Sequence, residues 1–127
     1  LIEHECPPIL INCLGIEKNS IFTEMTTENY NLVMNTNVTC HVELAKASIP
    51  PMVKNKWGRI IHISSEKAMR GSVGATLYSS SKSALQGLNR GLAKEYARFG
   101  ITSNIINLFI CKNKSFFFKI LPNVIDG

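Results

Sequence analysis

Tyr78 and Lys82 lie four positions apart in a segment whose apolar residues recur at helical spacing, so both side chains project from one helix face. A phenol has a reference pKa of about 10 and is a poor base at neutral pH. A nearby ammonium favours the phenolate and lowers that pKa, and the amino-terminal end of a helix adds a favourable dipole. The pair is therefore suited to donate a proton to a carbonyl, or to accept one from an alcohol.

Polar residues in the preceding segments extend this pair. Ser65 lies thirteen positions before Tyr78, at the end of a β-branched run, where its hydroxyl can hydrogen-bond a substrate oxygen. Asn37 lies within a helical pattern, where a buried amide needs partners. The sequence Asn12-Cys13-Leu14-Gly15 ends an earlier apolar run, where backbone groups can line a cofactor pocket.

The elements that must position these residues follow from the hydrophobic pattern. Short apolar runs predict three buried strands, and apolar positions at helical spacing predict two long helices between them. The strands cover residues 9–11, 59–65 and 101–108, and the helices cover residues 28–49 and 78–98. This order favours an α/β fold with a parallel sheet, whose strand carboxyl ends share the edge where such sheets bind ligands.

The helix ends carry their own signals. Thr26 or Thr27 is expected to cap the first helix, and Pro50-Pro51 is expected to end it or bend it sharply. Gly100 is expected to end the second helix. After Leu108 the chain is apolar and basic without clean periodicity, which leaves open a strand, a poorly ordered end or a sequence not selected to fold there.

Three of these segments, taken together, resemble the classical short-chain dehydrogenase/reductase family over about residues 9–108. The strand Gly58-Arg-Ile-Ile-His-Ile-Ser-Ser65 is similar to the family's catalytic-serine strand, and Tyr78-Ser-Ser-Ser-Lys82 matches its Tyr-x-x-x-Lys helix. Met34-Asn-Thr-Asn37-Val is similar to the helix that bears its catalytic asparagine. Residues 87–97 are most similar to ketoreductases of the 3-oxoacyl-carrier-protein reductase kind.

The resemblance implies hydride transfer between the nicotinamide C4 of NAD or NADP and a small carbonyl or alcohol substrate. Tyr78 would donate the proton, Lys82 would lower the Tyr78 pKa and hold the nicotinamide ribose, and Ser65 would orient the carbonyl. Asn37 would hold a water that connects Lys82 to solvent. The same family role makes Tyr78 and Lys82 cofactor contacts as well as catalytic residues.

The cofactor pocket is expected to be bordered by Asn12 and Gly15 on the adenosine-ribose side. The family's Asn-Asn-Ala-Gly is Asn12-Cys13-Leu14-Gly15 here, and Leu14 is bulkier than the family's alanine. The eight residues before Ile9 hold no Gly-x-x-x-Gly-x-Gly turn for the pyrophosphate. We therefore expect the second half of a Rossmann-like, doubly wound fold, with residues 1–108 as its catalytic portion and 109–127 as a divergent tail. We expect this chain alone to bind NAD(P)H weakly and to turn over little.

Composition, charge and cysteine spacing argue against several other classes of protein. The formal charge is +5, but the 14 Lys and Arg residues are spread along the chain, which argues against a nucleic-acid footprint. No apolar run approaches the roughly 20 residues of a membrane span, and no secretory signal opens the sequence. The scattered cysteines form no zinc pattern and indicate a reduced, cytoplasmic protein without a metal. They are Cys6, Cys13, Cys40 and Cys111.

Two rival interpretations remain. Ser79-Ser80-Ser81-Lys82 matches the Ser-x-x-Lys of penicillin-interacting hydrolases, but the Ser-Asp-Asn and Lys-Thr-Gly partners are missing. The other rival is a truncated, non-catalytic relative that acts as a binding or assembly partner. The apolar stripes of the two long helices could join copies into a homo-oligomer, or they could simply be core.

Overall fold

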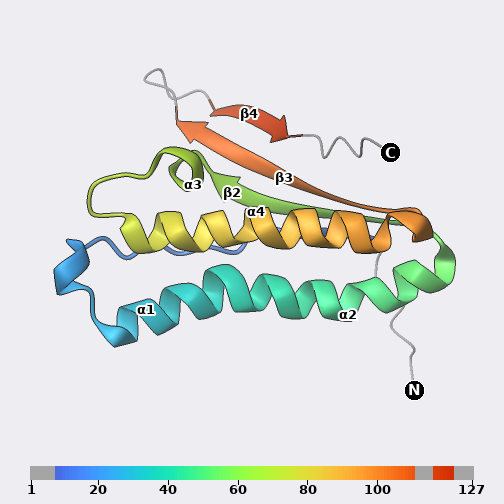
Figure 1. Cartoon of the computed structure of the whole chain (residues 1–127), viewed down its shortest axis with the longest axis horizontal. Coiled ribbons are helices and arrows are strands. Elements are labelled where there is room, and N and C mark those ends of the chain that lie inside the picture. The colour runs from blue at the N-terminus through green and yellow to red at the C-terminus, as the bar shows by residue number, and fades with distance from the viewer. Residues whose placement is uncertain (1–7, 111–115, 122–127) are drawn as a thin grey trace.

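A four-stranded sheet with the order β1-β2-β3-β4 is the frame of the molecule (Figure 1). The computed structural model describes residues 8–110 and 116–121, with side chains described through residue 109. The strands are β1 (Ile9–Asn12), β2 (Gly58–Ser65), β3 (Ile101–Ile110) and β4 (Phe116–Leu121). The helices are α1 (Thr27–Met34), α2 (Cys40–Asn55), α3 (Lys67–Arg70) and α4 (Thr76–Tyr96). Short non-α turns occupy Phe22–Glu24, Asn35–Thr39 and Ala97–Phe99.

The first three strands are parallel, which confirms the predicted partial Rossmann-like sheet. Asn12 pairs with His62, and Ser65 pairs with Leu108, so the carboxyl ends of β1, β2 and β3 reach the same region of the sheet. Helices α2 and α4 cover one face of the sheet, and α1 packs against α4 (Figure 1). The alternating burial along β2 follows from this arrangement, because every second residue faces the helices.

The apolar core lies near the start of β2 and β3, where α2 packs on the sheet. Its fully buried members are Ala45, Ile49, Met52, Ile60 and Ile101. Gly58 opens β2 directly against this cluster, because a Cβ at that position would overlap the Met52 side chain. The close approach of the Gly58 backbone to Met52 therefore requires glycine.

The first long helix differs from the prediction at its far end. Thr26 caps it, since its hydroxyl accepts a hydrogen bond from the Asn29 N–H at 3.1 Å. Of the two outcomes predicted at Pro50-Pro51, the stop is wrong, because α2 continues through both prolines to Asn55, and the sharp bend stays a prediction. Two prolines remove two helical N–H donors. Burial of Ile49 and Met52 on either side of them offsets that loss and keeps the helix intact.

A single π-helical turn, Asn35–Thr39, joins α1 to α2. Such turns admit an extra residue into a helix and are frequent at functional sites. The helical pattern in the sequence continues across this segment, so periodicity alone gave no sign of the irregular turn. The result is one long, locally widened helix from Thr27 to Asn55.

The second long helix begins at Thr76, two residues before the predicted start, and runs to Tyr96. Gly100 ends the segment with φ at 71°, as predicted, and a Cβ there would collide with the Lys56 carbonyl oxygen. No helix in the part of the chain that the structure describes is long and apolar enough to cross a membrane.

The carboxyl-terminal part contains more regular structure than its sequence pattern indicates. Strand β3 runs to Ile110, so the division predicted at residue 108 falls inside a strand. Strand β4 lies antiparallel to β3, with Ile106 opposite Ile120. Cys6 and Cys111 of the predicted cysteine set lie outside the described residues, while Cys13 and Cys40 are free thiols.

Candidate functional site

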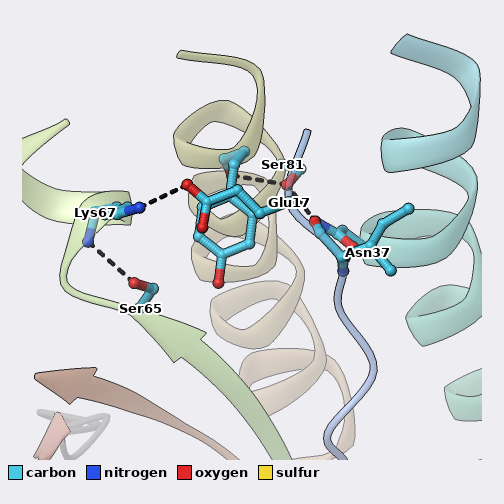
Figure 2. A network of polar contacts seen from close by, with 7 residues as sticks. Glu17, Asn37, Ser65, Lys67 and Ser81 are labelled. Atoms are coloured by element: carbon cyan, nitrogen blue, oxygen red, sulfur yellow. Dashed lines mark hydrogen bonds and ion pairs between the residues drawn. The ribbon is translucent and has the colours of Figure 1, made fainter. Parts of the chain in front are cut away.

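Ser65, Tyr78 and Lys82 come together where the end of β2 meets the start of α4. The backbone places them: Ser65 is the last residue of β2, and Tyr78 is the third residue of α4. The Ser65 hydroxyl is close enough to the Tyr78 phenol to lower the pKa of that phenol. The same Ser65 oxygen accepts the Lys67 backbone N–H at 3.2 Å, which fixes its direction (Figure 2).

Lys82 is held from two sides by backbone carbonyls. Its ammonium donates to the Leu14 oxygen and to the Ile63 oxygen, each at 3.0 Å. The side chain is 3% exposed, and its Nζ lies 6.0 Å from the centre of the Tyr78 ring. An ammonium has three N–H donors, so one is left without a partner among the described residues. That third N–H is available to a ligand.

Gly15 lies against the tip of Lys82. A Cβ at this position would be 2.7 Å from Lys82 Nζ and 3.8 Å from Asn37 Oδ1. The space beside the ammonium therefore exists because residue 15 has no side chain. Leu14 next to it turns its side chain outward, with 43% exposed, and contributes its carbonyl oxygen to the site. Its bulk does not fill the space beside Lys82.

Asn37 lies in the π-helical turn and is fully buried. Its Oδ1 accepts the Ile16 N–H at 2.8 Å, and its Nδ2 donates to the Ile16 oxygen and to Ser81 Oγ, each at 2.9 Å (Figure 2). These contacts tie the loop after β1 to α4. Both amide protons of Asn37 are used within the protein.

Asn12 does not join this group. Its side chain is 2% exposed and donates from Nδ2 to the His41 carbonyl oxygen at 3.5 Å. It connects β1 to α2 on the covered face of the sheet. Of the residues predicted for the site, the structure brings together Ser65, Tyr78, Lys82, Asn37 and Gly15.

An ion pair that no sequence pattern predicts crosses the site. Lys67 Nζ lies 2.5 Å from Glu17 Oε1, although the two residues are fifty positions apart (Figure 2). Lys67 is also 5.6 Å from the centre of the Tyr78 ring. Both side chains are about one third exposed, so the pair lies at the surface of the site. Glu17 lies in a loop and Lys67 begins α3, so no sequence periodicity connects them.

The Tyr78 pKa departs from the prediction. Burial raises the pKa of the Tyr78 phenol, and the Glu17 carboxylate acts in the same direction. The Ser65 hydroxyl and the Lys67 charge lower this pKa but do not outweigh burial. Lys82 is not among the groups that shift the Tyr78 pKa, so the predicted lowering by Lys82 stays a prediction. Burial also lowers the pKa of Lys82 itself, with the nearby Cys13 acting in the opposite direction.

Two buried histidines lie beside the Leu14 carbonyl that holds Lys82. His41 Nδ1 and His62 Nδ1 are 3.1 Å apart, and His41 Nε2 is 3.0 Å from the Leu14 oxygen. Burial lowers the pKa of His62 to about 4, and His41 and Lys82 act in the same direction. Sequence analysis missed this pair. The only signal was that His62 occupies a helix-facing position of the alternating strand β2.

Comparison with known proteins agrees with this geometry. The family model for short chain dehydrogenase matches residues 8–116. Acetoacetyl-CoA reductase from Cupriavidus necator is 37% identical over 99 residues, which is 78% of this chain and 40% of that protein. A 3-oxoacyl-[acyl-carrier-protein] reductase from Buchnera aphidicola (strain Bp) is 42% identical over 98 residues, or 77% of this chain and 40% of that protein.

A second 3-oxoacyl-[acyl-carrier-protein] reductase, from Haemophilus influenzae, is 38% identical over 98 residues, again 77% of this chain and 40% of the relative. The chain thus spans about two fifths of the length of the curated relatives that it matches. The matched region includes the whole Ser65, Tyr78 and Lys82 cluster. The chain belongs to the short-chain dehydrogenase family.

Proposed function

We propose that this chain carries the proton-transfer site of an NAD(P)-dependent ketoreductase. One observation supports it above the others: the Ser65 hydroxyl is close enough to the Tyr78 phenol to lower its pKa, and the Lys82 ammonium is 6.0 Å from the centre of the phenol ring. A hydroxyl pair beside a fixed cation can bind a carbonyl oxygen and deliver a proton to it.

The residues of the site fit a nicotinamide cofactor. The space beside Lys82 Nζ, which a Cβ at Gly15 would fill, leaves the third N–H of the ammonium open to a ribose hydroxyl. A bound nicotinamide would supply the hydride for the substrate carbon. Lys82 would hold the ribose, and Gly15 would allow its close approach. No residue described in this structure selects NAD over NADP. Asn12 would support the cofactor pocket as the end of strand β1 and not by direct contact with the cofactor.

The raised pKa of Tyr78 suits the direction of reduction. A buried phenol stays protonated at neutral pH and can therefore give its proton to the carbonyl oxygen as the carbon accepts hydride. Ser65 would orient that oxygen. Lys82 would stabilise the phenolate left behind, and Asn37 would keep Ser81 and the Ile16 loop in place so that a water can reach Lys82. The carbonyl gains one hydride and one proton and becomes an alcohol.

The substrate class proposed is a 3-oxoacyl thioester. The support is the names of the relatives, which act on acetoacetyl-CoA and on 3-oxoacyl groups of an acyl carrier protein. The similarity to named reductases favours this function over the truncated, non-catalytic relative. A cytoplasmic location belongs to the same proposal and agrees with the free thiols of Cys13 and Cys40.

A homo-oligomer through the two long helices also remains a proposal. Tyr30, Leu32 and Leu44 on the first long helix are each more than 40% exposed. Large apolar side chains that are exposed to water are suited to bury themselves against a second copy. Sedimentation velocity of the chain, repeated with Leu32→Glu, tests this. Loss of a dimer in the variant would support it, and a monomer at all concentrations would contradict it.

The reaction is tested by single-turnover oxidation of NADPH or NADH with acetoacetyl-CoA, at enzyme concentrations above that of the nucleotide. We expect Tyr78→Phe to reduce the rate by at least about a hundredfold, since it removes the acid and leaves the ring. Tyr30→Phe is the matched control, because Tyr30 is an exposed tyrosine outside the site. Equal rates for Tyr78→Phe and the unchanged chain would overturn the proposed role of Tyr78.

A further inference from the structure

His41 and His62 form a closed pair in the interior. His41 is at the start of α2, His62 is on β2, and both side chains are fully buried. Their ring centres are 5.4 Å apart with planes 26° from parallel, and the two Nδ1 atoms are 3.1 Å apart. This separation is that of a hydrogen bond, so one proton lies between the two Nδ1 atoms.

The partners of the pair determine where the protons are. The Leu14 oxygen can only accept, so His41 Nε2 must carry a hydrogen to bond it at 3.0 Å. A neutral His41 then has a bare Nδ1, and the hydrogen between the rings belongs to His62 Nδ1. His62 Nε2 is left bare, in agreement with its having no hydrogen-bond partner in the described part of the structure.

The Leu14 carbonyl connects the histidine pair to the Lys82 ammonium. It accepts from His41 Nε2 on one side and from Lys82 Nζ on the other, both at 3.0 Å. Two donors fill the two lone pairs of a carbonyl oxygen. The second anchor of Lys82 is the oxygen of Ile63, which directly follows His62 on β2. Both carbonyls that hold the ammonium are therefore connected to the histidine pair.

We propose that His41 and His62 are positioning residues, and that their single proton arrangement aims the Leu14 carbonyl at Lys82 and so fixes the ammonium beside Tyr78. His62 sets the tautomer of His41, and His41 sets the direction of the carbonyl. The consequence for catalysis rests on the proposed function, whereas the proton arrangement and the fixing of Lys82 do not.

The geometry distinguishes this role from plain packing. Two fully buried imidazoles cost desolvation, and apolar side chains of similar volume would fill the same space without it. The groups that face the pair are Lys82, which disfavours a second positive charge, and the Leu14 carbonyl. Both rings therefore stay neutral near pH 7, and the proton arrangement described above persists.

The proton arrangement is tested by ¹⁵N NMR of the imidazoles in the full chain. We expect His41 to carry its hydrogen on Nε2 and His62 to carry its hydrogen on Nδ1, with neither ring titrating between about pH 6 and 9. Finding the same tautomer in both rings, or titration of His62 near its ordinary pKa, would overturn the proposal before any variant is made.

The fixing of Lys82 is tested by ¹³C NMR of the lysine Cε groups. An ammonium held by two carbonyls should give Lys82 two inequivalent Hε protons, and these should merge in His41→Leu and in His62→Leu. His41→Gln and His62→Asn keep an N–H toward the same acceptor and should keep the signals apart. Ile49→Val is the control, because it loosens the apolar core without touching the pair. Separate signals in His41→Leu would overturn the positioning role.

Turnover supplies the remaining measurement. We expect His41→Leu to lower the single-turnover rate roughly tenfold with little change in the concentration of acetoacetyl-CoA at half-maximal rate, and His41→Gln to recover most of it. A rate unaffected by His41→Leu in a chain whose Tyr78→Phe variant is inactive would overturn the catalytic consequence. If Tyr78→Phe is also unaffected, the proposed function fails, and the NMR signatures still decide the fixing of Lys82.

Discussion

The interface between the helices and the sheet has two chemically different ends. At one end, five apolar residues from α2, β2 and β3 form the buried cluster around Met52 and Ile60. At the other end, residues of α2 and β2, together with residues of β1, α4 and the π-helical turn, bury polar and charged groups instead. These are Asn12, Asn37, His41, His62, Ser64, Ser81 and Lys82.

The difference shows how one layer serves two purposes. Apolar burial needs only a good fit, and stability rises with the area removed from water. A buried polar group needs a partner, so each one at the polar end constrains another residue. Asn37 fixes the Ile16 loop, and His41 fixes the Leu14 carbonyl. The apolar end holds the fold together, and the polar end determines where Lys82 is.

The largest expected effect is a loss of stability in acid that originates at the polar end. The pKa of His62 is lowered from 6.5 to about 4 in the folded chain, so the unfolded chain binds its proton first as pH falls. The contribution of His62 to the free energy of unfolding is therefore fully present above about pH 6.5 and is lost between about pH 6.5 and 4. The loss from this group reaches about 3 kcal/mol. Urea unfolding at a series of pH values measures it.

His62→Asn provides the comparison for that measurement. The variant keeps a donor toward His41 and has no titrating ring, so its stability should fall less steeply over the same pH range. The remaining slope belongs to His41 and the carboxylates. Equal slopes in the two proteins would show that His62 keeps an ordinary pKa and that the polar end is more open to water than the structure indicates.

Gly58→Ala should be the most damaging small change at the apolar end. The new Cβ would overlap the Cβ, Cγ and Sδ atoms of Met52, so the backbones of β2 and α2 must separate. Overpacking of this kind costs about 1–3 kcal/mol, which a denaturant midpoint reports. Adding Met52→Ala should make the loss smaller than the sum of the two single changes. Additive losses would argue against the contact.

Gly15→Ala makes the matching change at the polar end and should act on chemistry instead. Its Cβ would meet only the flexible tip of Lys82 at 2.7 and 3.1 Å, so the ammonium moves and the fold remains. We expect stability to change by less than about 0.5 kcal/mol. Single-turnover reduction should fall roughly tenfold, in line with the loss of one positioned donor.

Gly91→Ala in α4 is the control for both glycine variants. A Cβ at Gly91 meets nothing within 4 Å, so the change should stabilise α4 slightly and leave turnover unaltered. If Gly15→Ala resembles Gly91→Ala in turnover, the ammonium has room that the structure does not show. If it resembles Gly58→Ala in stability, the two ends are less distinct than described.

The smallest effect is expected from a surface ion pair that lies away from both the apolar end and the polar end of the interface. Glu43 and Lys46 form a surface pair at 3.2 Å, with side chains 60% and 69% exposed. Glu43→Gln should lower the free energy of unfolding by about 0.3 kcal/mol or less, and added salt should remove the difference. A loss above about 1 kcal/mol would mean that α2 depends on its outer face.

Much of the fold could be predicted because its signals are local. Apolar runs located β1, β2 and β3, Thr26 marked a helix start and Gly100 marked a helix end. The passage of α2 through Pro50-Pro51 could not be predicted, because burial of Ile49 and Met52 is a tertiary contribution that a local rule does not contain. Strand β4 lacked an alternating pattern and depends on its pairing with β3.

The site divides in the same way. Tyr78 and Lys82 were recognisable from their spacing on one helix, and Ser65 and Asn37 from the family resemblance. Glu17 lies in the loop after β1 and Lys67 begins α3 fifty positions later, and no sequence pattern connects them. His41 and His62 are 21 positions apart on different elements. Their pairing follows only from packing α2 on β2, and the raised Tyr78 pKa follows from burial that spacing does not report.

The π-helical turn has a consequence for which changes of length the chain can accept. Val33, Asn37, His41 and Ala45 are all buried, at regular steps of four residues. In a regular α-helix each such step overshoots one turn by about 0.4 residue, so four side chains would wind away from a single face. The wider turn at Asn35–Thr39 absorbs this drift. Deleting one residue there would rotate the two halves of the helix against each other, so this segment should tolerate substitution at its exposed positions far better than any insertion or deletion.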